Sequence, residues 1–248
     1  MLRNVSEIIN YVLLAKDGEI GRCKDFLYDD EKWAIRYMVA DTGKWLPSRK
    51  VLISPVSLGE PYWNTHRFQI DLTRRQIELS PPLDEHAPVS RQYEMIFANY
   101  YRTAPYWAGM GAWATQPSPS DLLAEEDKLA TEFKGTAENH LRSIKEVTGY
   151  HIQATDGEIG HVEDFAADDK TWDLRYVLVN TSKWLPHRRV LVSPQWITAV
   201  DWAEEKLWVD LTIDKVQNSP KYDIEEPINR DYECALHDYY CRRGYWQE

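Results

Sequence analysis

The chain is built from two copies of one sequence unit. When the sequence is shifted by 139 residues, Leu2–Trp107 aligns with Leu141–Trp246 without a gap, and 42 of the 106 aligned positions are identical. A gapless match of this length indicates duplication of a whole folding unit, because short solenoid repeats bury their apolar faces only by stacking. We therefore predict two domains, residues 1–107 and 141–248, joined by a linker at 108–140 that contains a helix.

Composition and charge exclude two classes of function. Across 248 residues the mean hydropathy is −0.57, and no segment approaches the ~18 apolar residues that a membrane span needs. The formal net charge is −11, from 29 Lys and Arg against 40 Asp and Glu. The first copy is neutral and residues 141–248 carry 13 basic against 20 acidic side chains. We expect no membrane insertion and no nucleic-acid binding, since phosphates would be repelled.

The three cysteines and the N-terminal segment indicate a cytoplasmic protein. Cys23, Cys234 and Cys241 form neither a disulfide framework nor a zinc-ligand pattern. The N-terminal apolar run resembles a weak signal peptide, but the same stretch recurs inside the chain at Leu141–Ala154. We interpret it as the first strand of a domain.

Each copy reads as a series of short strands followed by a helix. Apolar residues alternate with polar ones over residues 33–39 and 172–178, the period expected of a half-buried strand. Turn dipeptides and Ser-Pro pairs separate further short apolar runs, and the helices are expected at Arg91–Tyr101 and Arg230–Tyr240. The predicted fold class is therefore mainly β: two small, partly open β-barrels, each with a C-terminal helix.

One pattern, DGEIGxxxDFxxDDxxWxxRYxxxxTxxWLPxRxVLxSP, occurs in both copies, at 17–55 and 156–194. On this pattern the sequence resembles the PRC-barrel family, which is named for the cytoplasmic domain of the photosynthetic reaction-centre H subunit and also occurs in a ribosome maturation factor. The resemblance covers each repeat and its Tyr-rich tail. It implies a tandem-barrel fold, but members of the family share a barrel and not a reaction.

Enzyme chemistry is not expected. None of the seven histidines coincides with another under the 139-residue shift, and no HExxH, GxSxG or phosphate-loop motif is present. The acidic pairs Asp29-Asp30 and Asp168-Asp169 suit tight turns better than metal binding. The sequence therefore predicts no catalytic residues, no metal and no cofactor.

Two basic, Trp-containing loops are candidates for an interaction surface. KWLPSRK supplies Trp45, Arg49 and Lys50, and KWLPHRR supplies Trp184, Arg188 and Arg189. Aromatic residues beside arginine are enriched at interaction hot spots and can also stack a base or hold an anion. A structural role is the alternative, with each Trp covering a barrel mouth and each Arg paired with acidic neighbours.

The aromatic tails of the two copies are candidate docking elements. Their spacing places one apolar stripe on each C-terminal helix, which must be covered by its own barrel, the other barrel or a second chain. The residues are Tyr100, Tyr101, Tyr106 and Trp107 in the first copy, and Tyr239, Tyr240, Tyr245 and Trp246 in the second.

These observations favour a non-enzymatic adaptor or assembly module that binds a protein partner, including a second copy of itself. Two similar domains on one chain could imitate the dimer of a single-barrel ancestor. The resemblance leaves two alternatives open: RNA- or ribosome-associated maturation, and an auxiliary role in photosynthetic electron transfer like that of the H subunit.

Overall fold

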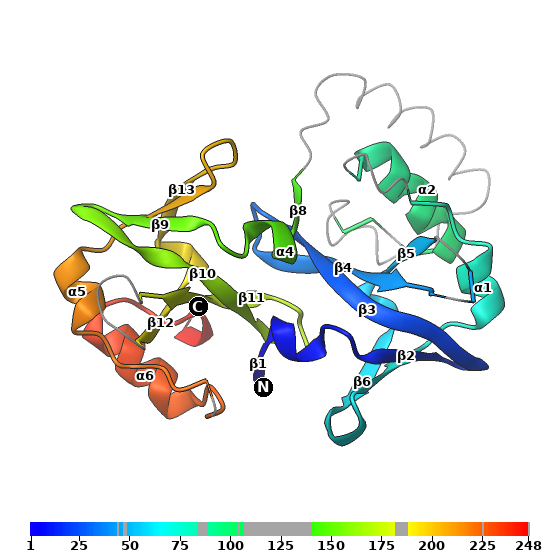
Figure 1. Ribbon diagram of the computed structural model, residues 1–248, viewed down its shortest axis with the longest axis horizontal. Coiled ribbons are helices and arrows are strands. Elements are labelled where there is room, and N and C mark those ends of the chain that lie inside the picture. Colours follow the sequence, from blue (N-terminus) through cyan, green and yellow to red (C-terminus); the bar gives the residue numbers. More distant parts are fainter. Residues whose placement is uncertain are drawn as a thin grey trace. The chain divides into compact units, whose positions relative to one another are not determined.

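The structure is a computed structural model that describes residues 1–43, 45–46, 49–83, 89–103, 105–106, 140–181, 188–224 and 226–247. Two seven-stranded sheets dominate it (Figure 1), which confirms the mainly β class. The chain divides into two compact units. The larger unit comprises Met1–Ile9, Asp25–Ile35 and Arg142–Glu248, and the smaller unit comprises Asn10–Lys24 and Arg36–Leu141.

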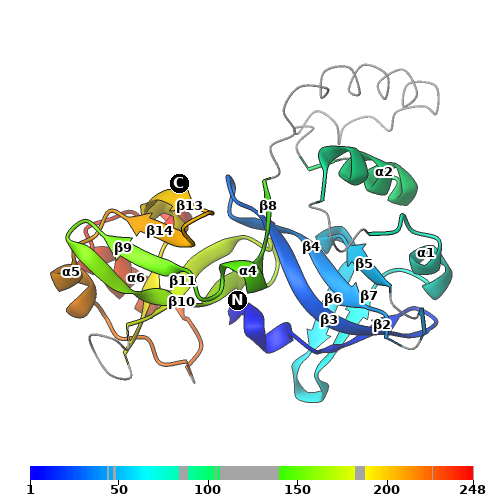
Figure 2. The same cartoon turned by 45° about the horizontal axis from the view of Figure 1, so that its top comes forward.

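The sheet of the first repeat has the strand order β5-β4-β3-β2-β7-β6, and β8 pairs with β3 outside this path. Its two helices lie near β5 at one side of the sheet (Figure 2). The elements are β2 (Val12–Ala15), β3 (Gly18–Asp29), β4 (Ala34–Asp41), β5 (Lys50–Ile53), β6 (Leu58–Tyr62), β7 (Arg67–Ile70), α1 (Arg74–Glu78), α2 (Arg91–Tyr101) and the 3-10 turns η2 (Pro55–Ser57) and η3 (Trp63–Thr65).

The sheet of the second repeat has the order β12-β11-β10-β9-β14-β13, and β1 pairs with β10 outside this path. The elements are β1 (Leu2–Asn4), η1 (Val5–Ile8), β8 (Leu141–Ser143), α4 (Ile144–Val147), β9 (His151–Ala154), β10 (Gly157–Asp168), β11 (Leu174–Asn180), β12 (Arg189–Val192), η5 (Pro194–Trp196), β13 (Ile197–Asp201), β14 (Lys206–Val209), α5 (Ile213–Gln217), α6 (Arg230–Tyr239) and η6 (Tyr245–Gln247).

Turn and cap residues explain where the elements begin and end. The Asp29 carboxylate accepts the backbone N–H groups of Glu31 and Lys32 at 3.0 and 3.1 Å, so this acidic pair shapes a turn as predicted. Ser90 caps the helix predicted at Arg91–Tyr101, and its boundaries are confirmed. Gly21 has a φ of 131°, and a Cβ there would lie 2.0 Å from the Asp41 carbonyl oxygen, so only glycine fits.

The two repeats exchange their first strands. The strand β1 belongs to the first repeat by sequence but pairs antiparallel with β10 of the second, with Leu2 opposite Asp168 and Asn4 opposite Ala166. Reciprocally, β8 at the start of the second repeat pairs with β3 of the first. Each sheet therefore takes one strand from the other repeat, whereas the predicted domains, residues 1–107 and 141–248, followed the repeats themselves.

Equivalent aspartates fix the exchanged segments within the larger unit. Asp164 accepts the Ser6 hydroxyl at 2.5 Å and the Ser6 N–H at 3.2 Å. Asp25 accepts the Ser143 hydroxyl at 2.5 Å and the Lys145 N–H at 3.3 Å. Position 145 is equivalent to position 6, so the backbone N–H contact is the same in both anchors, whereas the hydroxyl comes from Ser6 in one and from Ser143, which aligns with Asn4, in the other.

A pair of reciprocal backbone bonds completes the exchange. The Ile35 N–H donates to the Trp172 carbonyl, and the Leu174 N–H donates to the Trp33 carbonyl, both at 2.8 Å. Ile35 aligns with Leu174 and Trp33 with Trp172, so the two bonds are equivalent under the 139-residue shift. Trp33 and Trp172 both have positive φ angles, 52° and 62°, so the repeats share the same uncommon conformation at this point.

Neither sheet closes into a barrel through the described residues. The path of one sheet ends at β5 and β6, and the path of the other ends at β12 and β13, with no pairing between the two ends in either case. That each repeat forms a barrel therefore stays a prediction. The end strand β13 consequently has one edge with no described strand beside it.

Candidate interaction site

The first basic loop is used largely by its own repeat. Arg49 donates from Nη1 to the Glu78 carbonyl at 2.6 Å and from Nη2 to the Ser80 carbonyl, which holds the C-terminal end of α1. A guanidinium there also suits the negative end of the helix dipole. Trp45 is half-buried with the Arg74 guanidinium 4.7 Å from its ring centre. Lys50 is half-buried in β5.

The second basic loop follows the same plan. Arg188 donates to the Ser219 carbonyl, the position equivalent to Ser80. Arg189 pairs with Glu163, with its Nε 2.7 and 2.9 Å from the two carboxylate oxygens. Trp184 lies outside the described residues. The structural alternative thus explains Arg49 and Arg188, although their partners are helix-end carbonyls and not acids.

The aromatic tail of the first repeat packs on its own repeat. Phe97 of α2 meets Tyr37 of β4 edge to face at 5.2 Å, and Tyr101 lies 4.7 Å from Phe97. The Tyr100 hydroxyl donates to the Gln76 carbonyl at 2.7 Å. Tyr106 receives a hydrogen bond from Arg91, and Trp107 lies outside the described residues.

The second tail is docked in the same way. Tyr240 is buried against Trp196 with ring centres 4.7 Å apart, while Tyr239 is more than one-third exposed and donates to the Lys215 carbonyl at 2.9 Å. The Arg175 guanidinium lies over the Tyr245 ring, 4.0 Å from its centre, and the Arg230 guanidinium lies over the Trp246 ring at 4.1 Å. Each stripe thus packs on its own repeat, which is one of the three covers considered.

Beneath each tail lies a buried carboxylate held by arginine and tyrosine. Glu94 is 1% exposed and accepts Arg91 Nη1 at 3.1 Å, and Arg91 also donates to the Tyr106 hydroxyl at 2.6 Å. Burial raises the pKa of Glu94 to about 7, although Arg91 and the hydroxyls of Tyr106 and Tyr37 oppose this shift. Arg91 thus links Glu94 of α2 to the tail residue Tyr106 within the same repeat.

The second repeat contains the equivalent cluster with one addition. Glu233 is 3% exposed, accepts the Tyr176 hydroxyl at 3.0 Å and pairs with Arg230 at 3.2 Å. His237 lies 3.0 Å from the same hydroxyl, and burial lowers the pKa of its imidazole. The first repeat has Ala98 in place of His237, which is why the histidine had no counterpart in the sequence comparison.

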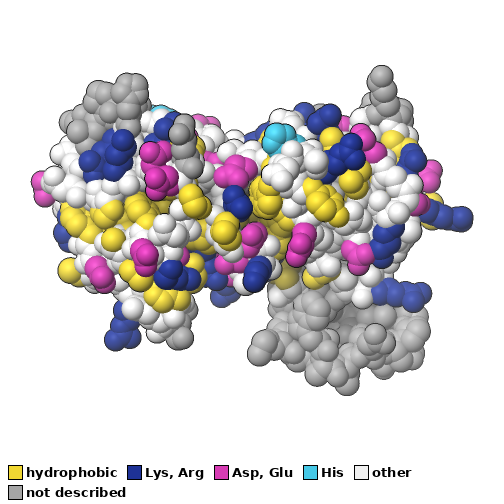
Figure 3. All heavy atoms as spheres, turned by 90° about the horizontal axis from the view of Figure 1, so that it is seen from below, with side chains coloured by type: hydrophobic (Ala, Val, Ile, Leu, Met, Phe, Trp, Pro, Cys, Tyr) yellow, Lys and Arg dark blue, Asp and Glu magenta, His cyan; other side chains and the backbone are white. Residues whose placement is uncertain are grey.

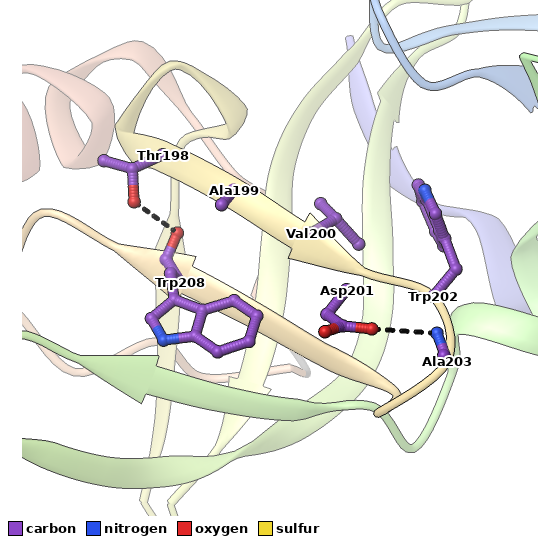
Figure 4. A pocket seen from close by; sticks show the side chains of 7 residues that line it. All are labelled: Thr198, Ala199, Val200, Asp201, Trp202, Ala203 and Trp208. Carbon is purple, nitrogen blue, oxygen red and sulfur yellow. Dashed lines mark hydrogen bonds between the residues drawn. The ribbon is translucent and has the colours of Figure 1, made fainter.

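A shallow apolar groove lies on the β13–β14 hairpin of the larger unit (Figure 4). Trp208 of β14 and Trp202 of the turn supply its aromatic surface, and both are half-buried. Ala199 is the cross-strand partner of Trp208, so its small side chain shares a face with the indole. The lining residues are Thr198, Ala199, Val200, Asp201, Trp202, Ala203 and Trp208.

The two tryptophans differ in what they contact. Trp202 carries the Arg142 guanidinium 4.0 Å from its ring centre and lies 6.2 Å from the Tyr150 ring. In the first repeat the ring centres of the equivalent residues Trp63 and Tyr11 lie 6.0 Å apart, so the Trp–Tyr contact is common to both repeats. In the described part of the chain, no cationic side chain lies over Trp208.

The residues that line the groove differ between the two repeats. Positions 198 to 200 read Thr-Ala-Val, whereas the equivalent residues of β6 are Gly59, Glu60 and Pro61. Trp208 corresponds to Gln69. Sequence reasoning did not single out any groove residue, although this difference between otherwise matched copies was visible in the alignment.

Charge near the groove is mostly acidic. The hairpin end carries Asp201, Glu204 and Glu205 against Lys206, which pairs with Glu204 at 3.3 Å. On the face drawn in Figure 3, basic and acidic side chains of the described residues are interspersed with apolar ones, without a continuous basic patch.

The described residues contain no group of three or more His, Cys, Asp or Glu placed to hold a metal ion.

Comparison with known sequences adds no relative. No protein-family model matches this chain, and no curated protein matches it. Among the helices that the structure describes, none combines the length and apolar character required to cross a bilayer.

Proposed function

We propose that the chain is a non-enzymatic protein-interaction module, an adaptor or assembly module built from two PRC-barrel-like repeats that exchange strands. The observation that carries the proposal is the apolar groove beside an open sheet edge in the second repeat, at positions where the first repeat has Gly59, Glu60 and Pro61. Half-buried tryptophan in an apolar concavity is typical of interface hot spots.

Arginines and carboxylates elsewhere in the repeats are already used to maintain the fold, which leaves the groove as the better candidate for the binding site. Arg49 and Arg188 hold helix ends, and the buried carboxylates Glu94 and Glu233 lie under docked tails. We further propose a cytoplasmic location, which is supported by three cysteines that are thiols and not members of disulfides in the structure.

Affinity capture of the tagged full chain from its native cells tests the proposal. Trp208→Gln places the residue of the first repeat into the groove and should remove a partner that the wild type retains. Tyr62→Gln is the matched control, because it exchanges an exposed aromatic residue at the other hairpin. If Trp208→Gln still captures every protein that the wild type captures, or if both variants lose the same proteins, the groove is not the binding site.

A further inference from the structure

The exposed edge of β13 has the character of a docking strand. In the described residues β13 is bonded to β14 on one side only. Its sequence, Ile-Thr-Ala-Val-Asp, is rich in β-branched residues and contains no proline, glycine or lysine. Proteins usually protect edge strands with proline, with charged residues such as lysine or with a β-bulge, because an open edge can pair with another chain. A register shift occurs in both β13 and β6, so proline is what distinguishes the two edges.

The equivalent edge in the first repeat is protected. The strand β6 reads Leu-Gly-Glu-Pro-Tyr, and Pro61 lies opposite Phe68 in the ladder. Proline is accommodated in an edge strand where its missing N–H would face outward. Since Val200 lies opposite Leu207, which aligns with Phe68, the N–H of Val200 is expected to face outward and to be available to an added strand.

The groove and the charges specify what the added strand contains. A strand added to the outer edge of β13 lies one strand away from β14, so a long side chain of that strand reaches Trp208 across the small Ala199. The Trp208 ring carries no described cation, whereas Trp202 already carries Arg142. A lysine or arginine of the partner can therefore stack on Trp208. The acidic hairpin end, and the 13 basic against 20 acidic residues of this repeat, attract a basic partner and repel a second copy of the chain.

We propose that β13 binds an extended, basic segment of a partner protein by β-strand addition, with backbone bonds to the outer edge and a cationic side chain on Trp208. This inference rests on the proposed function and specifies its partner chemistry. Main-chain bonds supply affinity in this mode, and alternate side chains supply specificity.

Fluorescence anisotropy with the full-length protein and a capped peptide of alternating valine and lysine tests the proposal. We expect saturable, salt-sensitive binding, and at least tenfold weaker binding of the matched valine–glutamate peptide. Val200→Pro should weaken the lysine peptide by about tenfold or more, because it removes an outward N–H. Val200→Thr retains the N–H and is the matched control, expected to bind like the wild type.

Folding of Val200→Pro is checked by its thermal transition, and the first repeat, which has proline at this position, indicates that the strand tolerates it. If the variant does not fold, Trp208→Gln and the charge-reversed peptide decide the outcome. Trp208→Gln retains the backbone edge and should weaken binding several-fold through loss of the cation–π contact.

Three results would overturn the proposal: equal affinity for both peptides, full binding by folded Val200→Pro, or a concentration-dependent dimer in sedimentation that Val200→Pro abolishes. The last result would assign the edge to a second copy. If the peptides fail but native partners are still captured through Trp208, the inference fails while the proposed function stands. If capture is also absent, both fail.

Discussion

At the scale of single residues, the structure separates side chains that maintain the fold from those open to a partner. Arg49 and Arg188 had the composition of a hot spot, yet both donate to carbonyls at helix ends 29 to 31 residues away. Trp208 is half-buried and lines the groove. Residue type alone therefore does not identify the interaction surface, because the same guanidinium suits a helix end and an interface.

The buried Glu94 gives a testable pH dependence. Its pKa of about 7 in the folded protein exceeds the ordinary 4.5, so the folded state binds more protons between these values. Stability should therefore fall as the pH rises from about 4.5 to 7 and change little above that through this group. The loss could reach about 3 kcal/mol, since one pKa unit corresponds to about 1.4 kcal/mol.

Urea unfolding at a series of pH values measures this effect. Between pH 4.5 and 7, the free energy of unfolding of Glu94→Gln should decrease less than that of the wild type, because glutamine does not titrate. Glu60→Gln removes an exposed carboxylate from the same repeat and should follow the wild type. Identical pH profiles for wild type and Glu94→Gln would show that Glu94 does not titrate in this range.

At the scale of elements, caps and turns follow from local sequence, but strand pairing does not. Ser90 before an amphipathic run and Asp29 in a turn were sufficient to predict the boundaries around them, because those bonds join neighbours in the chain. The partner of β1 was not predictable. In a duplicated chain, β3 and β10 carry matching sequences, so alternation specifies a strand without specifying which copy it joins.

The exchanged N-terminal strand depends on its Asp164 anchor. Asp164→Ala leaves the Ser6 N–H and hydroxyl without their acceptor, which should cost about 1 to 3 kcal/mol. Amides of Leu2–Asn4 should then exchange faster with deuterium than in the wild type. In Asp17→Ala, where the lost acceptor serves an exposed Arg74 N–H, they should be unaffected. Unchanged exchange in Asp164→Ala would contradict this role of the carboxylate.

The helix α6 docks through one of two adjacent tyrosines. Tyr240 is 4% exposed, so Tyr240→Ala should lower the free energy of unfolding by about 3 to 5 kcal/mol. Tyr239 is 38% exposed, and Tyr239→Ala should cost about 1 kcal/mol or less through loss of its bond to Lys215. Thermal and urea denaturation compare the two, and similar losses would contradict the packing of the tail.

At the scale of the whole molecule, duplication accounts for the exchange. A single repeat cannot supply the strand that its sheet receives from the other copy, so residues 141–248 alone should associate, each chain adding its β8 to the β10 of another. Light scattering after size exclusion should report a dimer at micromolar concentrations. A folded, stable monomer would show that the exchanged strand is dispensable.

Duplication also accounts for the proposed site. Two copies with a common fold allow one hairpin edge to remain protected by Gly59, Glu60 and Pro61 while the other is open. The alignment contained this difference, but its meaning depended on knowing that β6 and β13 are the last strands of their sheets. Sheet order depends on long-range pairing, which the period of apolar residues does not encode.

Photo-cross-linking in native cells tests the central claim most directly. A benzoylphenylalanine is introduced at the exposed position 203, in the turn beside the groove, or at the equivalent exposed position 64 of the first repeat as the matched control. The account predicts a discrete adduct from position 203 alone, mapped by mass spectrometry to an extended, lysine- or arginine-rich segment of another protein. No adduct from position 203, or the same adducts from both positions, would contradict it.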